Sequence, residues 1–174
     1  GTKRVVTTGL AIVAVALYER GSQLAAIPLS GLKETDLVYS HIPNHSWNTG
    51  IVLFNPGGSE ENVTVTAYDE TGSQVDELTL PVASGVRVIT NPAIGPGFTL
   101  PPEAVWFRAS SAGGLSGCEF FGRADETRFA GLRVTGSKSE RGIFPTVEKP
   151  SAGVTGISLV NPNGETAAVK LEAL

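Results

Sequence analysis

The two histidines of the chain are the first candidates for chemistry, because they stand four residues apart. On a helix, His41 and His45 would face one side, where two imidazoles could begin a metal site. Here they lie in a loop that contains Pro43 and Asn44, and no cysteine or carboxylate cluster stands nearby to complete a ligand set. We interpret both as exposed loop histidines and only weak metal candidates. The sequence predicts no metal and no cofactor.

Nucleophilic and acid–base catalysis also lack their sequence signals. No G-x-S-x-G turn presents a serine as a nucleophile. The acidic residues Asp69, Glu70, Asp76 and Glu77 fall in or beside a predicted hairpin, where such residues serve solubility and turn geometry. The glycine-rich stretches do not open a helix after a strand, so they do not predict a phosphate site. We expect that the protein is not an enzyme.

Aromatic residues are stronger candidates for binding, because flat rings can stack on sugars or on a partner protein. Trp47 and Phe98 lie in predicted loops, where sandwich scaffolds carry most of their binding residues. Tyr68 and Asn91 complete the candidate ligand-binding set. The alternative for a loop aromatic is a lid over the core, and Trp106, which has apolar neighbours, is predicted to be core.

One stretch of the sequence occurs twice, and this repeat organises the chain. Residues 47–56 read W-N-T-G-I-V-L-F-N-P, and residues 155–162 read T-G-I-S-L-V-N-P. Nine identities between residues 49 and 67 and residues 155 and 173 share one offset, 155 − 49 = 106. The motif positions that we interpret as structural are Thr49, Gly50, Asn55 and Pro56, and in the second copy Thr155, Gly156, Asn161 and Pro162.

A weaker match upstream has an offset of 105 residues, as in 144 − 39 = 105. It aligns Gly9-Leu10 with Gly114-Leu115, Leu24-Ala25 with Phe129-Ala130, Gly31 with Gly136, and Val38-Tyr39 with Ile143-Phe144. We therefore expect the chain to contain the C-terminal part of one repeat unit, then a complete unit, and then the N-terminal part of a third unit.

The repeat predicts how the chain divides. We expect a complete unit at 44–148 and a composite second unit formed by residues 1–43 and 149–174. Closure within the chain is preferred, because long exposed strand edges invite aggregation. The alternative is completion between neighbouring chains, which would make a homo-oligomer through edge strands.

Short apolar runs bounded by turn residues predict strands along the whole chain. Residues 62–68 alternate, with Val63, Val65 and Ala67 on one face. Residues 104–109 and 115–123 are predicted as two strands around a bend at 110–114. The predicted fold is all-β, with antiparallel β-sandwich units, Ig-like or jelly-roll-like, built from an internal repeat of about 105 residues.

The composition of the chain limits the classes of partner that it could bind. A net charge of −4 and a pI near 5.2 argue against nucleic-acid binding, which needs clustered Lys and Arg. The apolar run at 10–17 is too short to span a bilayer, and the repeat places it within a folded unit. We expect a strand there in preference to a signal peptide, and no membrane insertion. Cys118, the only cysteine, is predicted to be a small buried hydrophobe.

The motif W-x-T-G-I-x-L-x-N-P, followed by V-T-V-T-A-Y-D, resembles repeats of secreted or surface-attached bacterial proteins. The resemblance implies β-sandwich modules outside the cytoplasm (extracellular, on the cell surface or periplasmic), and it names no catalytic residue. We expect a non-enzymatic module for adhesion or carbohydrate binding, with a glycan or a surface protein as partner. The alternatives are a purely structural spacer or assembly module whose strands are completed between chains and, third, a secreted hydrolase.

Overall fold

The computed structural model describes residues 15–20, 23–28, 33–43, 47–90, 101–123, 128–144 and 156–172. Within these residues the chain is all-β, without a helix, and every strand pairing is antiparallel. No helix in this part of the chain is long and apolar enough to cross a membrane. Two compact units are present, Gly1–Gly136 and Ser137–Leu174.

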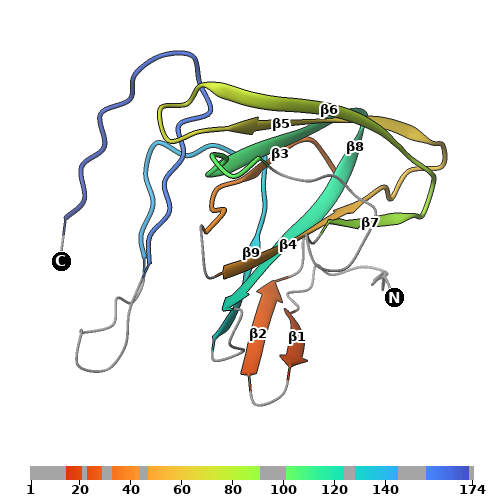
Figure 1. Cartoon of the computed structure of the whole chain (residues 1–174), viewed down its shortest axis with the longest axis horizontal. Helices are drawn as coiled ribbons and strands as arrows, with labels where there is room; N and C mark the ends of the chain where they lie inside the picture. The colour runs from red at the N-terminus through yellow and green to blue at the C-terminus, as the bar shows by residue number, and fades with distance from the viewer. Residues whose placement is uncertain are drawn as a thin grey trace, which may run out of the picture. The chain divides into compact units, whose positions relative to one another are not determined.

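All the strands found in the described residues lie in the first unit (Figure 1). They are β1 (Val15–Arg20), β2 (Gln23–Pro28), β3 (Glu34–Tyr39), β4 (Trp47–Phe54), β5 (Glu61–Tyr68), β6 (Gln74–Val82), β7 (Arg87–Thr90), β8 (Trp106–Arg123) and β9 (Phe129–Arg133).

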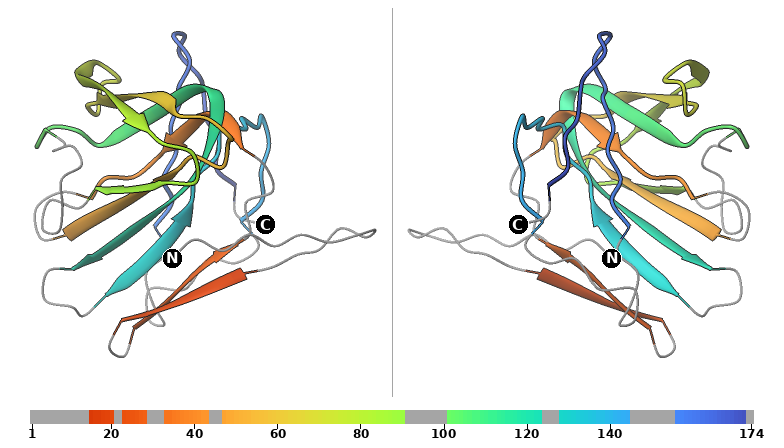
Figure 2. Two further views of the ribbon diagram at one scale, coloured as in Figure 1. Left: turned by 90° about the vertical axis from the view of Figure 1, so that its right-hand side faces the viewer. Right: turned by 90° about the vertical axis from the view of Figure 1, so that its left-hand side faces the viewer.

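Strand β8, 18 residues long, is the centre of a seven-stranded sheet with the path β6-β5-β8-β4-β7. The first half of β8 pairs with β5 and β3, and the second half pairs with β4 and β9. Because its two halves have different neighbours, the sheet curls around β8 into a half-barrel (Figure 1, Figure 2).

The prediction of two separate strands around a bend at 110–114 is wrong, because β8 runs through these residues as one strand. Gly114 takes the turning conformation, with φ of 80°, which glycine adopts without strain. The Glu61 carboxylate fixes the backbone beside it by accepting hydrogen bonds from the Ser111 hydroxyl and the Gly113 amide, both at 2.9 Å. The curvature is therefore built into one continuous strand.

The core lies inside the half-barrel and combines residues from both halves of the sheet. The predicted alternation in β5 is confirmed, since Val63, Val65 and Ala67 are buried. Tyr39 is fully buried, stacks on Phe107 at a centroid distance of 4.1 Å and donates a hydrogen bond to the Val52 carbonyl at 2.9 Å. The predicted burial of Trp106 and Cys118 is also confirmed, each at 9% exposure.

The Asn-Pro turn after β4 is held by the side chain of Asn55, which is fully buried. Its amide nitrogen donates to the carbonyls of Ser59 and Val82, and its oxygen accepts from the Gly57 amide, all at 2.8 Å. Asparagine in a turn commonly forms such local bonds with the backbone ahead of it, while the bond to Val82, 27 residues away, ties the turn to the end of β6.

Strands β1 and β2 form a separate two-stranded hairpin in the same unit. One face of the hairpin packs on the sheet, where Ile27 lies over Gly131 and Tyr18 meets the Phe120 ring edge-on at 4.6 Å. The opposite face exposes Val15, Leu17 and Leu24. The strand predicted in the apolar run 10–17 is found from Val15 onward, and the earlier residues of the run lie outside the described part of the chain.

In the second unit, the described residues contain no strand. Ile143 and Phe144, which the repeat aligns with Val38-Tyr39 of β3, form no strand. The predicted division into residues 44–148 and the two chain ends stays a prediction. Within the first unit, β3 pairs with β8, and Val38 forms an isolated antiparallel β-bridge with Thr135.

Two glycines on neighbouring strands give a matched test of this packing. A β-carbon on Gly117 would lie 2.3 Å from the Tyr39 hydroxyl and 2.6 Å from the Val52 carbonyl, whereas one on Gly50 would meet only the Phe120 carbonyl at 3.8 Å. We expect Gly117→Ala to lower the free energy of unfolding by about 3 kcal/mol, because it overpacks the core and breaks the tyrosine hydrogen bond.

Gly50→Ala is the control, and we expect it to change the free energy by less than about 0.5 kcal/mol. Urea unfolding measures both variants. Equal stabilities for the two variants would contradict the packing described around Tyr39.

Candidate functional site

An aromatic cluster lies where β4 begins and β8 ends. Trp47 is the cross-strand partner of Arg123 and meets the Phe121 ring edge-on at 5.7 Å. His41, which follows β3, approaches the same Phe121 ring at 5.2 Å. Trp47, Phe121 and His41 are all half-buried, so this cluster offers apolar ring surface beside a guanidinium group. Such a surface can stack on a sugar ring or on an aromatic side chain of a partner.

The indole ring of Trp47 is therefore not fully available to stack on a ligand. Trp47 belongs to a strand, not to the loop that the sequence predicted, and one side of its indole packs on Phe121. Part of the ring remains accessible for binding, and part serves the packing of the sheet end. Its role as a ligand-binding residue stays a prediction.

His41 is described, while His45 lies outside the described residues. Burial lowers the pKa of His41, which favours its neutral form near pH 7. In the part of the chain that the structure describes, no group of three or more His, Cys, Asp and Glu side chains could hold a metal ion.

Tyr68, the other described member of the predicted binding set, lies at the opposite end of β8. It is the cross-strand partner of Trp106 and stacks on it at a centroid distance of 4.0 Å with an interplanar angle of 7°. Nearby on β8, Arg108 forms an ion pair with Asp36 of β3. One face of Tyr68 is thus already occupied, and the fold does not bring Tyr68 together with Trp47. Phe98 and Asn91 lie outside the described residues.

A buried carboxyl group lies inside the half-barrel close to the aromatic cluster. Glu119 is fully buried, between Ile51 of β4 and Leu132 of β9 in the register of the sheet. Among the described residues, neither of its carboxyl oxygens has a hydrogen-bond partner, and the hydroxyl of buried Thr49, on the same face of the sheet, also has none. Removal from water raises the pKa of Glu119 to about 8, so the proton is retained at neutral pH.

Glu119, Phe121 and Arg123 were not predicted as site residues from the sequence. The stretch Cys118 to Phe121 is apolar except for its glutamate, which was the one available signal of a carboxyl group within a core strand. Recognising it required the pairing register, because only the register shows that Glu119 faces inward with Ile51. Cys118 beside it has its pKa raised to about 11 by burial, which makes the thiol a poor nucleophile.

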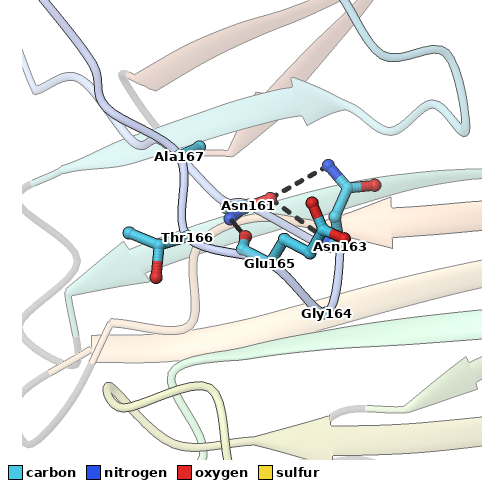
Figure 3. A pocket seen from close by; sticks show the side chains of 6 residues that line it. All are labelled: Asn161, Asn163, Gly164, Glu165, Thr166 and Ala167. Atoms are coloured by element: carbon cyan, nitrogen blue, oxygen red, sulfur yellow. Dashed lines mark hydrogen bonds between the residues drawn. The ribbon is translucent and has the colours of Figure 1, made fainter.

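A hollow lies in the unit Ser137–Leu174 and is shown in Figure 3. Its lining residues are Asn161, Asn163, Gly164, Glu165, Thr166 and Ala167. The Asn161 side chain donates to the Glu165 carbonyl at 2.6 Å and accepts from the Asn163 amide at 3.2 Å. These polar atoms hold the turn itself, so the hollow is better explained as the inside of a turn than as a ligand site.

Comparison with known protein families, with curated proteins and with solved structures finds no match to this chain.

The buried carboxyl predicts an unusual pH dependence of stability. The folded-state pKa of Glu119 is about 8, above its ordinary value of 4.5, so the folded chain binds a proton that the unfolded chain has lost. The contribution of this group to stability is therefore full below about pH 4.5 and declines as the pH rises towards 8.

Glu119→Leu removes the titrating group and fills the same apolar space. We expect its free energy of unfolding, relative to the wild type, to rise by on the order of 3 kcal/mol between pH 5 and pH 8. Urea unfolding across this range measures the difference, and Glu60→Leu, at an exposed glutamate, is the control for loss of a charge. Parallel curves for Glu119→Leu and the wild type would show that this carboxyl is not buried.

Proposed function

We propose that this chain carries tandem β-sandwich units of about 105 residues that act as non-enzymatic structural modules of a secreted or cell-surface protein. In this proposal the units space or assemble other parts of that protein outside the bacterial cytoplasm. The resemblance of the W-x-T-G-I-x-L-x-N-P motif to repeats of such proteins supports the location.

The observation that carries the proposal is the Asn-Pro turn, which the chain makes twice. In both copies the asparagine amide nitrogen donates to the carbonyl four residues ahead, Asn55 to Ser59 and Asn161 to Glu165. In both copies the asparagine oxygen accepts from the backbone amide two residues ahead. The most distinctive polar side chain of the repeated motif is therefore used to shape the backbone, which supports a structural role for the motif.

The proposed sandwich architecture starts from the curled sheet and its shared apolar interior. Core residues come from both parts of the half-barrel, with Ile51 and Leu53 from β4 and Val63 and Val65 from β5. Two layers of strands that share one apolar interior are the basis of a sandwich.

The two asparagines give a direct test of the structural role. Asn55→Ala leaves the Val82 and Ser59 carbonyls and the Gly57 amide without their partner, so we expect a loss of about 2–5 kcal/mol in the free energy of unfolding. Asn161→Ala removes the same local bonds at an exposed turn, and we expect a change below about 0.5 kcal/mol. Thermal or urea unfolding of the whole chain measures both. An unchanged stability for Asn55→Ala would refute the structural reading of the motif.

A second candidate function is adhesion or carbohydrate binding at the aromatic cluster. It is favoured by the half-exposed rings of Trp47, His41 and Phe121 beside Arg123. Under this candidate, glycans or surface proteins are the partners.

Trp47→Ala tests the second candidate. We expect a glycan that binds here to lose at least about fivefold in affinity, because stacking on the indole is worth about 1 kcal/mol or more. Isothermal titration against a panel of oligosaccharides measures this, and Tyr68→Ala, at the other end of β8, is the matched aromatic control. If no oligosaccharide binds the wild type, or if both variants lose affinity equally, glycan binding at this cluster is contradicted.

A further inference from the structure

One asparagine in the sequence is followed directly by glycine. This pair is Asn163-Gly164, in the turn of the second motif copy, and no other Asn-Gly pair occurs in the chain. Both residues are exposed and lie in a bend outside any strand. Because glycine has no side chain, its amide nitrogen can approach the side-chain carbonyl of the preceding asparagine with little steric hindrance. The pair is therefore a place where the chain could react with itself.

The second unit also places a cation on the carbonyl that would react. The Lys138 ammonium donates a hydrogen bond to the side-chain oxygen Oδ1 of Asn163 at 2.9 Å. The side-chain nitrogen of Asn163 donates to Asn161 Oδ1 at 3.0 Å, in the turn that Figure 3 shows. Attack on the side-chain carbon Cγ moves negative charge onto Oδ1, and an ammonium group at that atom stabilises the charge as it develops.

The first copy of the turn does not carry this reactive amide. With the offset of 106, Gly57 and Gly58 stand at the positions of Asn163 and Gly164. A β-carbon on Gly57 would lie 2.9 Å from Asn55 Oδ1, so a side chain there would force the turn to shift. In the second copy the bond from the backbone amide to the asparagine oxygen is 3.2 Å, compared with 2.8 Å in the first. The second turn is thus the looser of the two and accommodates a side chain.

We propose that Asn163-Gly164 is a self-modification site, at which the chain converts its own asparagine into aspartate or isoaspartate with the help of Lys138. The Gly164 amide nitrogen gives up its proton and bonds to Asn163 Cγ. The bond from Cγ to Nδ2 breaks, and Nδ2 leaves as ammonia with that proton. Water then opens the cyclic succinimide at either carbonyl, and no oxidant or reductant is needed. Reaction within one chain avoids the entropy cost of bringing two molecules together.

The modification would change the turn in two ways. Either product adds a negative charge, because its carboxyl group is ionised at neutral pH. In the aspartate product this charge stands at the atom that the Lys138 ammonium contacts in the unmodified chain. In the isoaspartate product the backbone is longer by one carbon, which displaces the amide of residue 163 from Asn161 Oδ1 and loosens the turn.

Peptide mapping by mass spectrometry tests the proposal on the whole chain, incubated at neutral pH and sampled over time. We expect Asn163 to convert at least about tenfold faster than Asn48 and Asn62, which lie in strands and precede bulky β-branched residues. Asn161 is a control within the same turn. It should not convert by this route, because Pro162 has no N–H group with which to attack.

Substitutions separate the chemistry of the pair from the effect of the fold. Gly164→Ala should slow the conversion of Asn163 at least about fivefold, because a β-carbon hinders the attack. Lys138→Met removes the ammonium and keeps an apolar stem, and we expect it to slow the conversion at least about threefold. Lys170→Met is the matched control, at an exposed lysine of the same unit that pairs with Glu172, and it should leave the rate unchanged. The effect of Lys138→Met should disappear in urea, where the contact with Asn163 is lost.

Three results would overturn the proposal. These are conversion of Asn163 no faster than that of Asn48 and Asn62, an unchanged rate in Gly164→Ala, and equal rates in Lys138→Met and Lys170→Met. The stability expected for Asn55→Ala depends on none of these rates, so the proposed structural role is tested separately.

Discussion

The fold depends on one strand that two halves of a sheet share. β8 pairs with β5 and β3 along its first half and with β4 and β9 along its second half. β8 changes direction at Gly114, next to the point where the Glu61 carboxylate accepts a hydrogen bond from the Gly113 amide. This change of direction curls the sheet into a half-barrel that encloses the core. At Gly117 the absence of a side chain leaves room for the Tyr39 hydroxyl to reach the Val52 carbonyl. Burial of the core follows from the position of β8.

This dependence explains why the two copies of the motif have similar turns and different surroundings. The bonds within each Asn-Pro turn are local, so Asn55 and Asn161 both form them. Burial is not local, because it requires a strand from elsewhere in the chain or from another chain. Ile51 is covered by the sheet, and its counterpart Ile157 is 39% exposed. The chemistry of the motif therefore shapes the turn, while the partner strand decides whether the motif becomes part of a core.

The same distinction separates what could be predicted from the sequence from what could not. The alternation at Val63, Val65 and Ala67, the turn at Asn55 and the burial of Trp106 follow from local pattern, and all are confirmed. Strand β8 was predicted as two strands, because Gly113-Gly114 resembles a break and only the distant Glu61 shows how it is spanned. The inward position of Glu119 and the separation of Trp47 from Tyr68 depend on register and topology, which a single sequence does not specify. Glu119 is the least expected feature, since its carboxyl lies among aliphatic residues that offer it no hydrogen bond.

Amide hydrogen exchange of the whole chain tests the central claim, that a β8-type partner decides the burial of each copy of the motif. The account predicts slow exchange at residues 51–53 and 63–65 at every protein concentration, because β8 covers them within the chain. It predicts fast exchange at residues 157–159 and 169–171, because the described residues of the second unit contain no strand and Ile157, Leu159, Val169 and Leu171 are exposed. Equal protection of the two copies would contradict the account.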